Sequence, residues 1–378
     1  MSSKQAVSDV LDHKQPEYIP IGMYAIDCDT VGRIIGHETY VRNKVKTQLA
    51  LWEGRRDEVA QSLREDSVEL FKKLPCLDIL IPFKEAQLLP PKGYIPVKPK
   101  RLDDKTWADT DGNMFIMSEL TNEFALVKSG HVETLDDYPE IVEFTPPDES
   151  IFEAYDCLVS AMTESRYIAG ISGGFSVLPL PGGMEEGLIK YILEPELIKA
   201  AVRYELNLGL MKDQYYIRPG VDGIFIEDDF STTISPLISP EMFRAFSFPA
   251  MSKRVAELKK HRNKVILHSC GHTWPLLDMI AETGVDGYQS LQTGAGMEIG
   301  KLKAQYGDRL CFWGGVAVEH LITGTMDEVR ADVRRAITEG AGNGGFILGP
   351  SHSAAFGTKY DNFMAMIDEH DKLKYSTK

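Results

Sequence analysis

The sequence predicts a (β/α)8 barrel, a closed ring of parallel strands surrounded by helices. Short apolar segments rich in β-branched residues alternate along the chain with longer segments of helical periodicity, and this alternation is typical of parallel sheets with crossover helices. The strand candidates number eight, as such a barrel requires. They are Tyr18–Ile26, Leu77–Pro82, Arg166–Ile171, Gly223–Ile226, Lys264–Leu267, Gly287–Leu291, Arg309–Trp313 and Gly345–Leu348. A doubly wound open sheet is the alternative architecture.

The chain has 378 residues, more than the roughly 250 residues of a typical (β/α)8 barrel. We assign the additional length to an N-terminal extension of about residues 1–17 and a Pro- and Lys-rich excursion of about residues 88–120. Within the excursion, Asn113–Leu120 reads as a hairpin strand outside the main sheet. No segment has the composition of a long linker, so we expect residues 1–378 to form a single barrel domain.

Helix boundaries are readable at several points between the strands. Ser239 followed by Pro240 predicts an N-cap with proline at the first helical position, opening a helix over Met242–Lys260. Thr325 with Glu328 three residues later is a capping box that opens a helix over Met326–Glu339. These signals place helices between the predicted strands, as a barrel requires.

Composition excludes several classes of protein. The net charge is −15, and a surface of that sign repels nucleic acid. No apolar run approaches the ~18 residues of a membrane span, and the first residues have no hydrophobic segment typical of a signal peptide. The five cysteines are widely spaced and form no CxxC pair, which predicts reduced thiols and a cytoplasmic location.

Polar side chains gather where the predicted strands end, which is where barrels place their functional groups. They comprise Glu227, Asp228 and Asp229 after the fourth strand, His268 and Cys270 after the fifth, Gln289 and Gln292 at the sixth, and Ser351 and His352 after the eighth. We therefore expect one rim of the barrel to carry carboxylates, histidines and a thiol.

The pair His268 and Cys270 is the sharpest chemical signal. On an extended segment, residues i and i+2 point to the same side, so both side chains can hold one ion. Imidazole with thiolate suits zinc, and three protein ligands leave a fourth position open for catalysis. His352 is the first candidate for the third ligand, followed by the cluster Glu227–Asp229. The alternative is that His268 and Cys270 are buried residues without a metal.

The second half of the chain resembles the uroporphyrinogen decarboxylase superfamily, and within it the cobalamin-dependent methyltransferases. The similarity extends from about Gly220 to Ile367, whereas the first 200 residues share only the opening His13–Pro20. The segments that carry it are Val265–Gly271, Gly284–Asp286, Gly314–Gly315, Gly324–Thr325 and Ile347–His352. The resemblance implies a (β/α)8 barrel with its site at the carboxyl ends of the strands.

The first strand favours the methyltransferase branch. Decarboxylases of the superfamily carry an arginine-rich segment there, which holds an acidic tetrapyrrole, whereas Gly22–Asp29 contains aspartates and the next arginine is Arg33. The methyltransferases bind zinc through the HxCG element and a later cysteine. Here His352 occupies the position of that cysteine, so this chain departs from the pattern of the branch at its third ligand.

The resemblance implies a zinc-dependent transfer of a methyl group between a small methylated substrate and the cobalt of a corrinoid protein. In one direction, a thiol accepts the methyl group from cobalt. In the other direction, a compound such as an aryl methyl ether donates its methyl group to cobalt. A site with a second histidine ligand suits an oxygen substrate and therefore favours demethylation. We expect Asp228, Asp229 or Glu227 to supply a proton or a further ligand. We expect substrate contacts from Tyr24, Asp27, Gln289, Gln292 and Trp313.

The cobalamin is expected on a separate protein. The nearest match to a DxHxxG cobalamin motif is Asp368–Leu373, which lacks the glycine and reads as a tail helix. A homodimer is expected because barrels of this superfamily are often dimers. The alternatives are a decarboxylase of a small or tetrapyrrole carboxylic acid, and a non-catalytic barrel that binds a ligand or a partner protein.

Overall fold

A computed structural model describes residues 1–376. Seven parallel strands form one curled sheet in the sequential order β1-β6-β7-β8-β9-β10-β11. They are β1 (Ile79–Leu80), β6 (Tyr167–Ile171), β7 (Gly223–Glu227), β8 (Val265–His268), β9 (Gly287–Gln289), β10 (Cys311–Val316) and β11 (Phe346–Pro350). The sequential order has no point at which it reverses, which argues against a doubly wound open sheet.

The segment around Gly22 joins the two edges of this sheet. Ile21 bridges Leu348 of β11, and Gly22 bridges Ile79 of β1, both in the parallel direction. The Gly22 N–H donates to the carbonyl of Leu348 at 2.9 Å. A Cβ at Gly22 would lie 2.3 Å from Ile79 Cγ2, so only glycine allows this close approach. The first predicted strand, Tyr18–Ile26, is therefore reduced to bridges, and the fold is the predicted (β/α)8 barrel.

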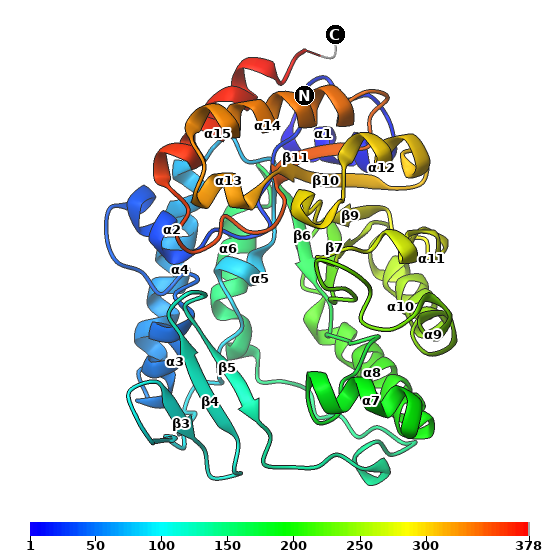
Figure 1. Cartoon of the computed structure of the whole chain (residues 1–378). Coiled ribbons are helices and arrows are strands. Elements are labelled where there is room, and N and C mark those ends of the chain that lie inside the picture. The colour runs from blue at the N-terminus through cyan, green and yellow to red at the C-terminus, as the bar shows by residue number, and fades with distance from the viewer. Residues whose placement is uncertain (377–378) are drawn as a thin grey trace.

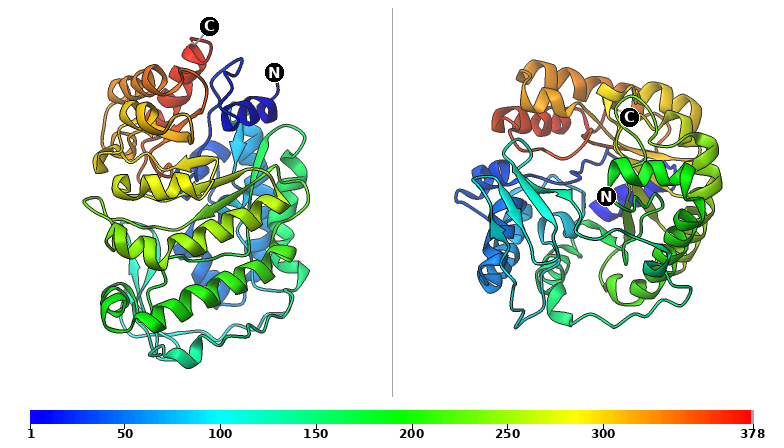
Figure 2. Two further views of the ribbon diagram at one scale, coloured as in Figure 1. Left: turned by 90° about the vertical axis from the view of Figure 1, so that its right-hand side faces the viewer. Right: turned by 60° about the horizontal axis from the view of Figure 1, so that its bottom comes forward.

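Helices cover the outer face of the sheet (Figure 1), and Figure 2 shows successive ones, green to yellow, lying side by side. Besides the N-terminal helix, those of nine or more residues are α3 (Lys44–Trp52), α4 (Arg56–Lys73), α6 (Glu153–Met162), α7 (Met184–Leu193), α8 (Pro195–Tyr216), α10 (Phe248–His261), α14 (Met326–Gly340) and α15 (Tyr360–Leu373). The shorter ones are α2 (Cys28–Ile35), α5 (Pro82–Glu85), α9 (Pro240–Phe246), α11 (Leu277–Glu282), α12 (Ile299–Tyr306) and α13 (Val318–Ile322). Among residues 1–376, no helix combines the length and the hydrophobicity that crossing a bilayer requires.

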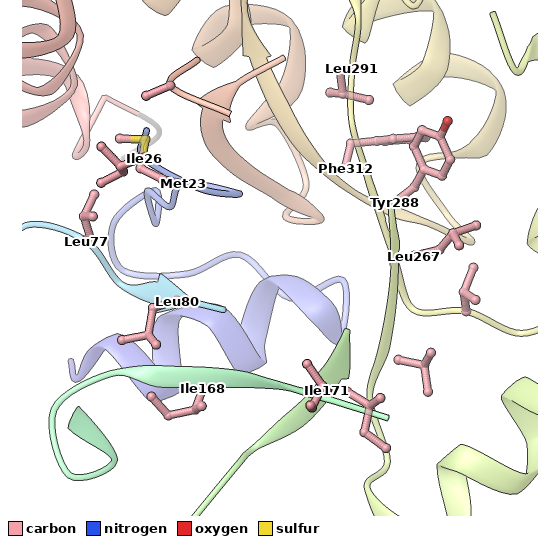
Figure 3. Close-up of a cluster of buried hydrophobic side chains, with 14 of the residues drawn as sticks. Met23, Ile26, Leu77, Leu80, Ile168, Ile171, Leu267, Tyr288, Leu291 and Phe312 are labelled. Atoms are coloured by element: carbon pink, nitrogen blue, oxygen red, sulfur yellow. The ribbon is translucent and has the colours of Figure 1, made fainter. Parts of the chain in front are cut away.

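Two apolar layers follow from the alternation of side chains along each strand. In β8, Val265 and Leu267 belong to the large cluster between the sheet and the helices, whereas Ile266 belongs to a smaller cluster inside the barrel. Figure 3 shows part of the outer cluster, where Leu80 and Ile168 point to the same side of neighbouring strands. In β8, the same alternation turns His268, two residues after Ile266, toward the inside of the barrel.

The N-terminal helix α1 (Ser3–Leu11) closes the end of the barrel opposite the strand carboxyl ends. Its side chains Val7, Val10 and Leu11 are part of the inner cluster, together with Trp313 and Ile347 of the strands. The predicted N-terminal extension is thus packed into the barrel. It leaves the carboxyl ends of the strands as the open end.

The predicted excursion is a small antiparallel sheet in the order β2-β3-β4-β5, visible at the lower left of Figure 1. Its strands are β2 (Lys100–Arg101), β3 (Thr106–Ala108), β4 (Met114–Ser118) and β5 (Glu123–Lys128). The strand predicted at Asn113–Leu120 is β4, but the sheet continues to Lys128, beyond the predicted limit at residue 120. Phe124 of β5 packs on Trp52 of α3, with ring centroids 4.9 Å apart.

The helix predicted over Met242–Lys260 is two helices, which is a correction. Ser239 caps α9 as predicted, with its hydroxyl accepting the Met242 N–H, but α9 ends at Phe246 and α10 begins at Phe248. Pro249 lies in the first turn of α10. Because proline has no N–H and clashes with the preceding turn of a helix, it prevents one continuous helix.

The other helix signals agree with the structure. The capping box of Thr325 and Glu328 opens α14. Residues Asp368–Leu373 lie in the last turns of α15, and the buried ring of His370 contacts the carbonyl of Ile19 at 2.8 Å. This histidine therefore holds the terminal helix to the barrel, in agreement with the prediction of a tail helix.

Candidate metal centre

Three side chains from the carboxyl ends of two strands meet inside the barrel mouth. His268 is the last residue of β8, Cys270 follows it, and His352 follows β11. One ligand atom from each lies within 4.8 Å of the other two. The structure therefore brings together the three residues that the sequence singled out as metal ligands, although they are distant in the chain.

His268 is held in a defined orientation. Its ring is 3% exposed, and Nδ1 forms a hydrogen bond with the side-chain Oε1 of Gln289 on the neighbouring strand. Since an amide oxygen only accepts, Nδ1 carries the proton and Nε2 keeps its lone pair for a metal. The ring also stacks on Tyr24, with centroids 4.2 Å apart. Burial lowers the pKa of His268, which favours the neutral, ligating form.

Cys270 sits in surroundings that disfavour a free thiolate. Burial, together with the nearby carboxylate of Asp229, raises the pKa of its thiol to about 12. The backbone N–H of Cys270 donates to Asp229 Oδ1 at 3.0 Å, which fixes the segment after β8. The thiol therefore ionises readily only when a cation lies beside it.

His352 completes the cluster from the opposite part of the ring. Burial and the neighbouring His268 lower its pKa to about 4, so the ring is neutral at physiological pH. Its Nδ1 lies 3.1 Å from the hydroxyl of Ser353, and its ring meets Tyr24 edge-on with centroids 5.5 Å apart. Both histidines thus pack around the same tyrosine.

The donor set fits zinc. Two imidazoles and one sulfur form a borderline-soft set of three, the number of protein ligands in catalytic zinc sites. Ligand atoms on tetrahedral zinc are about 3.5 Å apart, so the 4.8 Å span requires a small inward movement of the side chains on binding.

The three carboxylate side chains after β7 contact different partners. Asp229 is the nearest to the metal ligands, with Oδ1 3.8 Å from His268 Nε2. Asp228 instead accepts the N–H of Val177 at 2.6 Å, and burial raises its pKa to about 7. Glu227 points to Lys84. Of this predicted cluster, only Asp229 lies in position to serve as a further metal ligand.

Glu227 belongs to a polar group at the edge of the site. Its Oε2 accepts a hydrogen bond from the Tyr24 hydroxyl at 2.7 Å and forms an ion pair with Lys84 at 2.5 Å. Burial acts to raise the pKa of Glu227, but the Lys84 ammonium and these hydrogen bonds hold it below its usual value. Glu227 is therefore ionised and paired.

The five residues predicted to contact substrate lie in different environments in the structure. Tyr24 lines the cavity at the metal centre. Gln289 supports His268, and Gln292 accepts the N–H of Gly271 at 3.0 Å. Trp313 is 1% exposed and donates its indole N–H to the carbonyl of Gly22, inside the barrel core. Asp27 forms an ion pair with Arg42.

Sequence reasoning missed two cations at the barrel mouth, Lys84 and Arg42. Lys84 follows strand β1 and pairs with Glu227, while Arg42 pairs with Asp27 at 2.8 Å. The rule that functional groups follow strand ends would have found Lys84, because it comes directly after the predicted strand Leu77–Pro82. Arg42 lies far from any strand end, and no local pattern indicated its position.

The metal centre opens into a cavity of about 770 Å³. His268, Cys270 and Asp229 form one part of its wall, and the loop Ser176–Pro181 forms another. The size is within the range of small-molecule sites. Two of the three ligands, His268 and Cys270, therefore line a space that a small substrate can enter.

The similarity of this chain to known proteins agrees with the geometry of the site. The sequence profile of the uroporphyrinogen decarboxylase (URO-D) family matches residues 131–373. The chain belongs to the URO-D family. The match covers β6 to β11 and all three residues of the metal centre, and it extends the similarity seen in the sequence toward the N-terminus.

Two relatives of this URO-D protein come from Methanosarcina mazei. A methylated-thiol–coenzyme M methyltransferase is 27% identical over 171 residues, which are 45% of this chain and 42% of that protein. The match thus spans less than half of the relative's length. The solved structure of a methyltransferase aligns over 99% of both chains with a TM-score of 0.65 and 17% identity. This likeness shows that the fold is shared over the whole chain.

Proposed function

We propose that this URO-D family member is a zinc-dependent methyltransferase. It would move a methyl group between a small methylated substrate and the cobalt of a corrinoid protein. The meeting of His268, Cys270 and His352 within 4.8 Å is the observation that carries the proposal. The named activity of the Methanosarcina methylated-thiol–coenzyme M methyltransferase supports it, since that protein is similar in sequence.

When bound, zinc would act as a Lewis acid toward the heteroatom that gains or loses the methyl group. His268 and His352 would bind it as neutral imidazoles, and Cys270 as a thiolate. Gln289 would keep the tautomer and the orientation of His268 through their hydrogen bond. Tyr24 would limit the movement of both histidine rings, because it contacts each of them.

Proton transfer to a leaving oxygen is assigned to Asp228. It lines the cavity of the metal centre, and its pKa of about 7 lets it hold or release a proton near neutral pH. Glu227 is less suited, because Lys84 keeps it ionised. Asp229 would serve as the alternative further ligand because of its distance to His268.

We assign the direction of transfer as demethylation of an oxygen compound, such as an aryl methyl ether. His352 replaces a sulfur ligand by nitrogen and makes a harder site, which favours an oxygen substrate over a thiol. The corrinoid would be carried by a separate protein that docks over the barrel mouth. The homodimer, the single domain over residues 1–378 and the cytoplasmic location stay predictions.

A decarboxylase is the second candidate, since the family takes its name from one. It would need free cations to hold acidic groups. The two cations at the mouth, Arg42 and Lys84, are already paired with Asp27 and Glu227. This pairing favours transfer chemistry over the binding of a polyacid.

The metal content of the purified protein tests the ligand set. Wild type should contain one zinc per chain, and the variants His268→Ala and Cys270→Ser should lose it. Cys157→Ser is the matched control, because this cysteine lies on α6. Unchanged zinc in both site variants, or full activity of metal-free protein, would overturn the proposal.

A second experiment tests the reaction. Zinc-loaded protein is mixed with reduced cobalamin and with methoxylated aromatics, methylamines or methyl thiols, and the absorbance of the cobalt is followed. We expect methylation of cobalt with methoxylated aromatics and none with the His268→Ala variant. Release of CO2 from small carboxylic acids, without any change at cobalt, would instead support the decarboxylase.

A further inference from the structure

A second cavity, of about 330 Å³, lies beside the metal centre. We refer to it as the apolar chamber. It is reached from the carboxyl ends of β1, β6 and β7, and nothing in the proposed transfer chemistry uses it so far. The aromatic and aliphatic side chains that define it are Phe83, Leu88, Ile171, Phe175, Phe225 and Phe230.

We propose that the apolar chamber binds the uncharged aromatic ring of the substrate, with the substituent that carries the methyl group directed toward the metal centre. This inference deepens the proposed function and rests on it for the direction of the methyl group. The binding of the ring itself is independent of metal and corrinoid, and it can be tested without them.

The volume of the chamber suits a substituted ring. An apolar cavity of about 150 Å³ binds benzene. The chamber, at about 330 Å³, has room for a ring with one or more substituents. Its phenylalanine side chains also offer the edge-to-face and offset contacts that aromatic rings prefer.

The cations in and behind the chamber wall are already paired, which disfavours an anionic ligand. Arg254 and Asp213 are both 1% exposed and form an ion pair with each other. Lys84 is paired with Glu227. An anionic ligand would lose its hydration without gaining a free counter-ion, whereas a neutral ring has no charge to desolvate.

One polar group of a wall residue lacks a partner in the described part of the chain. The Nε–H of Arg254 is buried and has no hydrogen-bond acceptor among residues 1–376. Because an unsatisfied buried donor is costly, an ether or phenol oxygen on the ring would be a suitable acceptor. An oxygenated ring that moved the wall enough to reach this N–H would gain a hydrogen bond that a pure hydrocarbon cannot form.

The chamber and the cavity of the metal centre share a wall. Glu227 and Asp228 line both spaces. Along the loop after β6, Phe175 and Val177 line the chamber, whereas Ser176 lines the metal cavity. When the ring of a substrate lies in the chamber and its methylated substituent extends toward the metal centre, the substituent would thus lie beside the proposed proton donor Asp228.

The test uses metal-free protein, titrated with methoxybenzene and separately with benzoate, a ring of similar size that carries a negative charge. Binding is measured by calorimetry and by the ¹³C resonance of the Met251 methyl group, since Met251 lines the chamber. Met326 is 44% exposed on another helix and serves as the reference resonance. We expect saturable binding of methoxybenzene with a shift at Met251 and none at Met326, and no binding of benzoate.

Two variants fill the chamber, Leu88→Trp and Ser172→Trp. Each should weaken methoxybenzene binding at least about tenfold, a change of about 1.4 kcal/mol. The control Leu120→Trp alters a residue that is 84% exposed, and it should bind as wild type does. An unmoved Met251 resonance in wild type at high methoxybenzene concentration would overturn the inference, and this outcome does not depend on whether the variants fold. Equal methoxybenzene affinity in wild type and in a variant that folds would also overturn it.

The same titration separates this inference from the proposed function. His268→Ala should lose zinc and methyl transfer but bind methoxybenzene with unchanged affinity. Ring binding without zinc-dependent transfer would refute the proposed function alone. Zinc-dependent transfer from a methylated oxygen compound that has no aromatic ring, together with no binding of methoxybenzene, would refute the ring-binding inference alone.

Discussion

His268 and Gln289 face each other on the adjacent strands β8 and β9, and the imidazole Nδ1 is hydrogen bonded to the amide oxygen. The two residues are register partners, so the parallel pairing of the strands sets this contact. A histidine that binds a metal is usually oriented by such a partner on its other nitrogen. Gln289, which was expected to touch substrate, therefore acts on the metal centre through His268.

The first prediction concerns this contact. Gln289→Leu removes the acceptor of the Nδ1 proton while keeping a side chain of similar size. We expect the affinity for zinc to fall by about 10- to 100-fold, because the ring loses its fixed tautomer and orientation. Competition with a chromogenic chelator measures the change, and the exposed Gln61→Leu is the control. Equal zinc affinity in Gln289→Leu and wild type would contradict the role assigned to Gln289.

The second prediction concerns the third ligand. His352→Cys replaces one zinc ligand by another, whereas His352→Ala removes it. We expect the cysteine variant to retain one zinc per chain and the alanine variant to bind zinc at least about tenfold more weakly, since one of three protein ligands is lost. Zinc content after dialysis checks both. If the alanine variant retained zinc like wild type, Asp229 would be the better candidate for the third ligand.

The third prediction concerns the pH dependence of stability. Burial raises the pKa of Glu85 to about 8, although Arg42 acts to lower it. In the unfolded chain this carboxyl ionises near the ordinary glutamate pKa of 4.5, so between these two values the folded state binds more protons. The free energy of unfolding should therefore fall as the pH rises through this window, by up to about 1.4 kcal/mol per pH unit.

Glu85→Gln should flatten that dependence, because its amide does not titrate and its oxygen can still accept the Ile26 N–H. Urea unfolding at pH 5, 6.5 and 8 measures the difference. The control Glu119→Gln changes an exposed carboxylate, and its profile should follow that of wild type. Identical pH profiles for Glu85→Gln and wild type would show that Glu85 is ionised in the folded protein.

The fourth prediction concerns the buried ion pair below the apolar chamber. Asp213 pairs with Arg254 at 2.6 Å and also accepts the N–H of Gly173 at 2.9 Å. Asp213→Asn leaves a buried guanidinium without its counter-charge, which should lower the free energy of unfolding by about 3–5 kcal/mol.

The exposed pair of Lys199 and Glu196 provides the control for this prediction. Glu196→Gln should change the free energy of unfolding by at most about 1 kcal/mol, since solvent screens the charges. Urea denaturation compares the two variants. A loss in Asp213→Asn as small as that of the control would mean that water reaches Arg254.

The order of strands and helices, and the residues that follow each strand end, could be predicted from the amino-acid sequence. Local periodicity and capping set these features, because side-chain spacing along a strand or helix depends on neighbouring residues only. His268 and Cys270 were readable for the same reason, being two positions apart on one extended segment. Where a local signal was overlooked, as with Pro249 in the predicted long helix, the expectation was wrong.

Which of these side chains contact one another depends on how the strands and helices pack in three dimensions. His352 joins His268 because the ring of strands closes, and Glu227 turns away from the metal ligands because Lys84 neutralises it. The apolar chamber likewise exists only where side chains from three strands and the loop around Phe175 leave a space between them. Such contacts depend on packing between segments far apart in the chain, so patterns among neighbouring residues do not predict them.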